Sequence, residues 1–170
     1  MRRMRLFILT GLFAAAAALL TSRPTAAPPD LVSVEVIRYE SLGDRIQALK
    51  GRAVVVDFWA TYCLPCKKEF PRLVELHRKY ATKGLAAVSV SLDDATDEHA
   101  REEANRFLTD KQAAFSNFLL DEKPEFWQAK LKIDGPPCVF VFDRSGRLVK
   151  RYHDDVDYSE IDRIVADLLK

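Results

Sequence analysis

The chain has 170 residues, of which 48% are hydrophobic and 30% are charged, a composition that suits one globular domain with an adequate core. Its three cysteines are too few for a fold built mainly on disulfides. The formal net charge of +1 hides an asymmetry, because four arginines precede the first acidic residue and the chain beyond residue 23 carries 22 basic and 25 acidic groups. No basic patch remains there, so nucleic acid is excluded as an expected partner.

The N-terminal residues have the pattern of a secretory signal. A short basic segment, "MRRMR", precedes 15 uncharged and mostly apolar residues (6–20), and the small, proline-rich "TSRPTAAPP" follows. A membrane-spanning helix needs about 20 apolar residues, so the run is short for one. We therefore expect a signal peptide or N-terminal anchor with its linker over 1–27. The domain is expected to be exported, periplasmic or anchored at the outer face of the cytoplasmic membrane, where disulfides persist.

Residues 31–170 are predicted to form one domain in which strands and helices alternate before two strands meet across a tight turn. In chain order the expected elements are a strand (31–39), a helix (41–51), a buried strand (53–60), a helix (63–84), a strand (85–93), a polar helix (94–112), a strand (115–121), a short helix (124–133), two strands (137–143 and 147–153) and a closing helix (158–170). Gly84 is expected to stop the second helix, and Thr96 to cap the third. This order predicts a mixed β-sheet with helices on both faces, an α/β fold.

Two cysteines, Cys63 and Cys66, come just after the buried strand and open the long helix, where open α/β sheets usually place their sites. Unpaired N–H groups and the positive end of the helix dipole favour a thiolate there. A C-x-x-C pair in this setting can exchange disulfides, with Cys63 attacking a partner and Cys66 resolving the mixed disulfide. Pro65 stiffens the turn where a missing N–H costs little.

Two other interpretations of the cysteine pair stay open at this point. A structural zinc site needs two more ligands, and no second pair at ligand spacing exists among the remaining candidates, Cys138, His77, His99 and His153. A purely structural disulfide would close a loop of only four residues, so its entropic contribution to stability would be small.

An acidic residue, Asp57, interrupts the apolar strand "VVVDFWA". Burial would raise the pKa of its carboxyl group and allow it to carry a proton near neutral pH. We therefore expect Asp57 to relay protons to Cys66, directly or through water. The alternative is a structural acid whose oxygens are satisfied by neighbouring hydrogen bonds.

The segment "VVVDFWATYCLPCKKEFP" resembles the active-site strand and helix of the thioredoxin superfamily. The "FWAT" and "EFP" flanks and the export pattern are similar to its TlpA/ResA-like branch. The resemblance spans about 35–170. It implies a thioredoxin-like fold in which the helix and strand between 94 and 121 are that branch's insertion. It also implies that Cys63 is the nucleophile, Cys66 the resolving cysteine and Asp57 the buried acid.

The same resemblance implies where a substrate is contacted. Pro137 resembles the cis-proline that faces the cysteine pair, and proline lowers the cost of a cis bond. The implied substrate-contacting residues are Trp59, Tyr62, Pro65, Pro136, Pro137 and Cys138. Leu92 stands where cytochrome c maturation relatives have a glutamate, which weakens that particular assignment.

The third cysteine, Cys138, stands where relatives of this superfamily usually have threonine. One hypothesis is a third thiol that exchanges disulfides with Cys63 or helps to bind a soft metal. The other is a small buried residue that packs as threonine would, since buried free cysteines behave as small hydrophobes.

The expected function is that of an exported thiol–disulfide oxidoreductase acting on protein disulfides. The resemblance implies that it reduces them, with electrons from a membrane-embedded thiol carrier and without a cofactor or metal. A peroxiredoxin-like peroxidase is one alternative, although the adjacent C-x-x-C pattern speaks against it. A thioredoxin-fold module that binds a metal or a client protein is the other.

Overall fold

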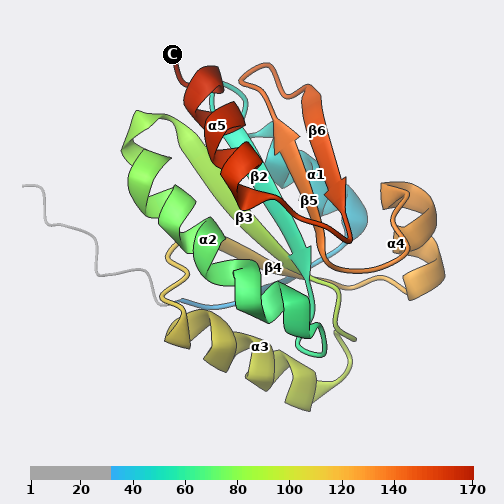
Figure 1. Cartoon of the computed structure of the whole chain (residues 1–170). Helices are drawn as coiled ribbons and strands as arrows, with labels where there is room; N and C mark the ends of the chain where they lie inside the picture. The colour runs from blue at the N-terminus through green and yellow to red at the C-terminus, as the bar shows by residue number, and fades with distance from the viewer. Residues whose placement is uncertain (1–31) are drawn as a thin grey trace, which may run out of the picture.

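The computed structural model describes residues 32–170, and the signal or anchor expected over 1–27 lies outside the described residues. Six strands form one sheet in the order β1-β4-β3-β2-β5-β6 (Figure 1). The strands are β1 (Glu35–Ile37), β2 (Ala53–Trp59), β3 (Leu85–Ser91), β4 (Ser116–Leu120), β5 (Cys138–Phe142) and β6 (Leu148–His153). The helices are α1 (Tyr39–Gln47), α2 (Leu64–Tyr80), the 3₁₀ turn η1 (Ala81–Lys83), α3 (Glu98–Asp110), α4 (Pro124–Leu131) and α5 (Tyr158–Leu168). Every predicted strand and helix is present, most of them shorter at their ends than predicted.

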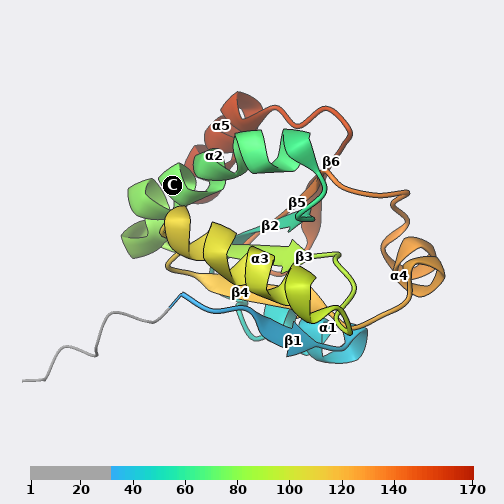
Figure 2. The same ribbon diagram turned by 90° about the horizontal axis from the view of Figure 1, so that it is seen from below.

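The core is divided by the sheet into two hydrophobic clusters. One lies beneath α2, α3 and α5, and the other beneath α1 and α4. Figure 2 shows α2 and α5 on one side of the sheet and α1 on the other. All residues of the inner strands β2 and β3 are buried. Their near-continuous apolar sequences follow from this burial on both faces.

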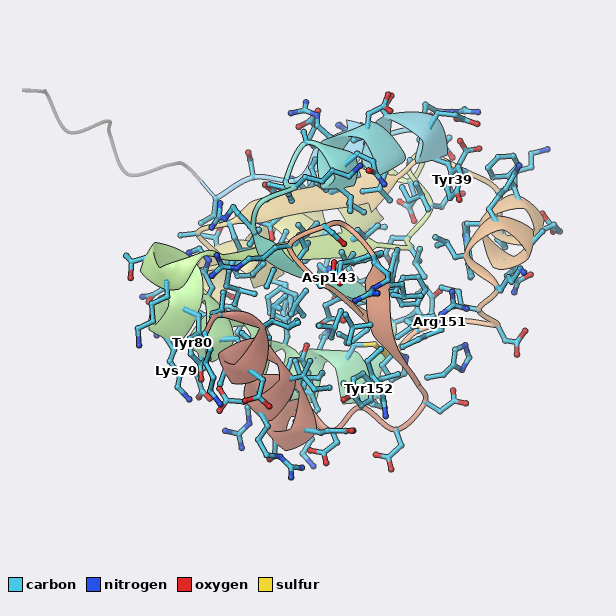
Figure 3. The ribbon with its side chains drawn as sticks, turned by 90° about the horizontal axis from the view of Figure 1, so that it is seen from above. Tyr39, Lys79, Tyr80, Asp143, Arg151 and Tyr152 are labelled. Carbon is cyan, nitrogen blue, oxygen red and sulfur yellow. A yellow bond between two sulfur atoms is a disulfide. The ribbon has the colours of Figure 1, made fainter. Side chains whose placement is uncertain are left out.

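The sheet is mixed, as predicted. The strands β1, β4, β3 and β2 run parallel to one another, whereas β5 is antiparallel to both β2 and β6. In the tight turn between β5 and β6, Asp143 accepts hydrogen bonds from the backbone N–H groups of Ser145 and Arg147. Figure 3 shows that Arg151 and Tyr152, consecutive on β6, point to opposite faces of the sheet.

Of the inserted helix and strand, β4 is an interior strand of the sheet and α3 packs on one of its faces. β4 lies between β3 and β1 and pairs with both. The prediction that Thr96 caps α3 is wrong: Asp97 is the N-cap, and its carboxylate accepts hydrogen bonds from the N–H groups of His99 and Ala100. Thr96 instead donates its hydroxyl and its backbone N–H to Asp94, which organises the turn before the helix.

The long helix α2 positions the cysteine pair. It starts directly after Cys63 and continues through Pro71 to Tyr80. Its apolar side chains recur at helical spacing and are buried, namely Phe70, Leu73, Val74, Leu76 and Tyr80. The helical segment ends after η1 at Gly84, as predicted. The φ of Gly84 is 106°, in the left-handed region that glycine adopts without steric cost.

Candidate functional site

Cys63 and Cys66 form a disulfide at the N-terminus of α2, with their Cα atoms 5.3 Å apart. Cys63 is the N-cap residue, and its Sγ accepts a hydrogen bond from the backbone N–H of Cys66 at 3.2 Å. A thiolate formed on Cys63 after reduction would keep this donor and the positive end of the helix dipole. Cys66 lies inside the first turn, and both cysteines are buried, Cys63 at 6% and Cys66 at 3% exposed. The N-cap position and the hydrogen bond from the Cys66 N–H, and not exposure, favour Cys63 as the nucleophile.

Exposed apolar side chains flank the disulfide. Tyr62 is 67% exposed and Leu64 is 74% exposed, and Pro65 beside them is exposed as well. Apolar groups held out in solvent next to a reactive pair are suited to contact with another molecule. Tyr62 and Pro65, which were predicted to contact substrate, are therefore accessible to another molecule.

The second edge of the site is the segment before β5. The peptide bond between Pro136 and Pro137 is cis, as predicted, and both prolines are half-buried. Pro137 lines a cavity of about 230 Å³ together with Pro65 and Cys66. The fold therefore brings the proline segment against the cysteine pair, although more than 70 residues separate them in the sequence.

Asp57 lines the same cavity from beneath, and is 4% exposed. Burial raises the pKa of its carboxyl group to about 7, against an opposing effect of the hydrogen bond that Tyr158 donates to it. The phenol Oη and Asp57 Oδ2 are 2.8 Å apart. A carboxyl group that titrates near neutral pH beside Cys66 can accept and return a proton.

The indole of Trp59 does not lie at the surface of the site, and the prediction that it contacts substrate is wrong. It is fully buried and packs against Phe70 of α2 and Phe107 of α3, with ring centroids 5.4 and 4.9 Å away. The inserted helix covers the ring. Trp59 therefore supports the base of the cysteine loop from inside the core.

The thiol of Cys138 faces away from the disulfide. It belongs to the cluster beneath α1 and α4, whereas Cys63 and Cys66 belong to the cluster on the other face of the sheet. Its Sγ donates to the carbonyl oxygen of Tyr152 at 2.9 Å, and the side chain is fully buried. The prediction that this side chain contacts substrate is therefore wrong, and the geometry favours the small packing residue over a third exchanging thiol.

Native Cys138 is expected to be inert to thiol reagents. Burial raises its pKa to about 12 from an ordinary 9.0, so its thiolate fraction at pH 8 falls about a thousandfold. Oxidised protein should show no reactive thiol when folded and one when denatured, the labelled peptide containing Cys138. Rapid labelling of one thiol in the folded protein would contradict this placement.

Sequence reasoning missed the group that holds the loop before Cys63. Buried Asp93 accepts hydrogen bonds from the backbone N–H and the hydroxyl of Thr61, at 3.0 and 2.7 Å, and from the hydroxyl of Ser91. Lys67 donates to the Thr61 carbonyl oxygen and pairs with Glu103 of α3. A detectable signal existed, because β2 and β3 are parallel and their carboxyl ends place "ATYC" beside "SLDD".

Tyr158 was also missed. It precedes Ile161 and Val165 by three and seven positions, a helical spacing that places it on the buried face of α5. That signal could have predicted its burial but not its partner, which lies 101 residues away.

Two further tests apply to residues 32–170. In this range no three His, Cys, Asp or Glu side chains are grouped in a way that could hold a metal ion. No helix within the same range has the length and apolar character needed to cross a membrane.

Comparisons with known proteins give a consistent result. A family profile described as Redoxin matches residues 44–168. The thiol-disulfide oxidoreductase ResA of Bacillus thuringiensis is 28% identical over 106 residues, which cover 62% of this chain and 57% of that protein. The thioredoxin-like protein YneN of Bacillus subtilis is 32% identical over 101 residues, covering 59% and 56% respectively. The chain thus spans little more than half the length of these curated relatives.

A solved structure supports the fold directly. It is a thiol:disulfide interchange protein of the thioredoxin family from Chlorobium tepidum, 26% identical, with a TM-score of 0.59 over 72% of this chain and 83% of that one. The expected thioredoxin-like architecture, a central mixed sheet flanked by helices, is confirmed.

Proposed function

Because the chain belongs to the redoxin family, we propose that it is a thiol–disulfide oxidoreductase that exchanges its Cys63–Cys66 pair with disulfides of protein substrates. The observation that carries this proposal is the disulfide at the N-terminus of α2, with the Cys66 N–H directed at the Cys63 sulfur. The activities in the names of the relatives support it. The exposed Tyr62 and Leu64 and the half-buried prolines provide a rim for an extended substrate segment.

The reaction uses only the two cysteines as redox groups. The Cys63 thiolate attacks one sulfur of the substrate disulfide, a mixed disulfide forms, and the other substrate sulfur leaves as a thiolate. Cys66 then loses its proton and attacks the Cys63 sulfur. This closes the Cys63–Cys66 disulfide and releases the second substrate thiol. Two electrons pass to the substrate, and an external dithiol must return them before the next cycle.

Asp57 supports the second half of this reaction. Its carboxyl group, with a pKa near 7, lines the cavity that also touches Cys66. In the ionised form it can take the proton that Cys66 must lose before it attacks. The cavity, of about 230 Å³, is large enough for a bridging water molecule.

We further propose that the protein is exported, that it acts as a reductant and that a membrane-embedded thiol carrier supplies its electrons. The signal-like residues 1–27 support export. The resemblance of the active-site segment to the TlpA/ResA-like branch supports reduction. The potential of the cysteine pair tests the direction: a value near −270 mV indicates a reductant and one near −120 mV an oxidant.

Reduction of insulin by the full chain, with dithiothreitol as electron source, tests the activity. We expect turnover above the dithiothreitol background, and none with a protein in which both Cys63 and Cys66 are serine. Equal turnover by the two proteins would refute the proposal. If neither insulin nor another disulfide protein is reduced, a client- or metal-binding module becomes the better interpretation.

A further inference from the structure

A tyrosine on the last helix, Tyr158, is the hydrogen-bond partner of the buried acid. It is the first residue of α5 and is 8% exposed. Its hydroxyl donates to Oδ2 of Asp57, and no other hydrogen bond to this carboxyl group comes from residues 32–170. The two side chains come from the centre of the sheet and from the helix that closes the fold, so their contact depends on the docking of α5.

The position of the Tyr158 hydroxyl is fixed by the start of α5. Asp157 caps the helix by accepting hydrogen bonds from the N–H groups of Ser159 and Glu160. One turn later, fully buried Ile161 anchors the same face of the helix in the core. A side chain held between a cap and a core anchor has little freedom, so the phenol is presented to Asp57 in one place.

The two oxygens of Asp57 therefore differ in their surroundings. Oδ2 accepts a hydrogen bond from the Tyr158 hydroxyl, and the two oxygens are 2.8 Å apart. Oδ1 accepts no hydrogen bond from the described residues. It is nevertheless not one of the solvent-inaccessible polar atoms without a partner, so it remains accessible from the cavity. Cys66 lines that cavity as well. Burial and the neighbouring carboxylate hold the pKa of Tyr158 well above its ordinary value, so the phenol keeps its proton and acts as a donor.

We propose that Tyr158 is a positioning residue for proton transfer: its hydroxyl occupies Oδ2 of Asp57 and leaves Oδ1, the oxygen that reaches the cavity beside Cys66, to take and release the proton. The inference rests on the proposed proton role of Asp57. It adds a second function for α5, which otherwise only covers the sheet. It also predicts that the phenol stabilises the ionised carboxylate, because its donated hydrogen bond is stronger to a charged acceptor.

Other titratable groups also face Asp57 and could contribute to its pKa. They are Cys66, Lys68 and Glu69 from α2, Asp154 and Asp155 from the segment before α5, and Tyr158 from α5, while Cys138 lies close on the other face of the sheet. All of them except Tyr158 are unchanged in a Tyr158→Phe protein, which keeps the aromatic ring. A difference between that protein and the wild type therefore reports the hydroxyl group.

The first test follows Asp57 itself. Carboxyl ¹³C NMR of the reduced protein, with the Asp57 signal assigned from the spectrum of Asp57→Asn, gives its titration midpoint. We expect Tyr158→Phe to raise this midpoint by about one pH unit or more. Tyr152→Phe is the matched control. Tyr152 is also a buried tyrosine of the same cluster, but its hydroxyl makes no hydrogen bond to Asp57, and its removal should leave the midpoint unchanged.

The second test measures exchange. The pH profile of mixed-disulfide resolution should shift upward in Tyr158→Phe by the same amount as the Asp57 midpoint, and Tyr152→Phe should retain the wild-type profile. If Asp57→Asn removes the inflection but Tyr158→Phe moves neither the midpoint nor the profile, the inference about Tyr158 is overturned alone. If Asp57→Asn leaves the profile unchanged, the proton role of Asp57 fails and the inference fails with it.

Discussion

Replacing Cys66 by serine is expected to trap a covalent complex with a disulfide substrate, whereas replacing Cys63 by serine is expected to prevent its formation. Cys63 carries the sulfur at the open end of the helix, where it accepts the Cys66 N–H. Without Cys66 the mixed disulfide forms but cannot resolve. Without Cys63 the remaining thiol of the pair lies inside the first turn and not at the N-cap position, where the free N–H groups and the helix dipole favour a thiolate. Either change should lower turnover by about 10³-fold or more, because serine at position 63 cannot form the mixed disulfide and serine at position 66 cannot resolve it.

The two variants are separated by electrophoresis without reductant and by mass spectrometry of the complex. The expected adduct contains one substrate chain linked to Cys63 and disappears when dithiothreitol is added. Cys138→Ser provides the control, since its thiol lies on the other face of the sheet and its loss should leave turnover unaltered. Equal trapping by both active-site variants would contradict the assignment of Cys63 as the nucleophile.

Replacing Asp57 by asparagine is expected to stabilise the folded protein at alkaline pH. The carboxyl pKa is about 7 in the folded state against an ordinary 3.8. The folded state therefore binds this proton more tightly than the unfolded chain does. The contribution of this proton to the stability of the wild-type protein is fully present below about pH 4 and is lost as the pH rises through 7. Three pKa units correspond to about 4 kcal/mol, an upper bound on the gain in the free energy of unfolding at pH 8.

Chemical denaturation of the oxidised proteins at pH 4 and pH 8 measures this difference. Asp57→Asn should gain stability over the wild type at pH 8 and much less at pH 4, since the wild-type carboxyl group is then largely protonated. Asp155→Asn is a suitable control, because this acid is exposed at the mouth of the same cavity. An equal gain at both pH values would show that the effect comes from packing and not from the buried charge.

The fold was predictable because its signals are local. Strands such as β2 and β3, which are buried on both faces, have uninterrupted apolar sequences. The cysteine pair, Asp57 and Pro137 belong to short segments that can be recognised in the sequence. The predictions for Trp59 and Cys138 failed because they depended on which elements cover each face of the sheet. Cys138 pairs with Phe58 across β2 and β5, while Val139 pairs with Asp57. This register puts the thiol on the face opposite the disulfide.

The roles of Tyr158 and Asp93 could not be predicted from local sequence patterns for a different reason. Each becomes meaningful only through a contact with a segment distant in sequence: Asp57 for the tyrosine, and the loop at Thr61 for the aspartate. Hydrophobic periodicity can predict that such side chains are buried. It carries no information about which polar group they meet, because that depends on the docking of complete elements.

The location of β4 bears on how the sheet could have been enlarged. Among the described residues β1 pairs only with β4, and Phe107 of the adjoining α3 covers Trp59. A shortened chain without 94–121 would have to move β1 sideways by one strand spacing, about 4.8 Å, to reach β3. It would also uncover the indole beneath the cysteine loop. Because β4 lies between β1 and β3 and not at an edge of the sheet, the inserted segment cannot be removed without displacing β1.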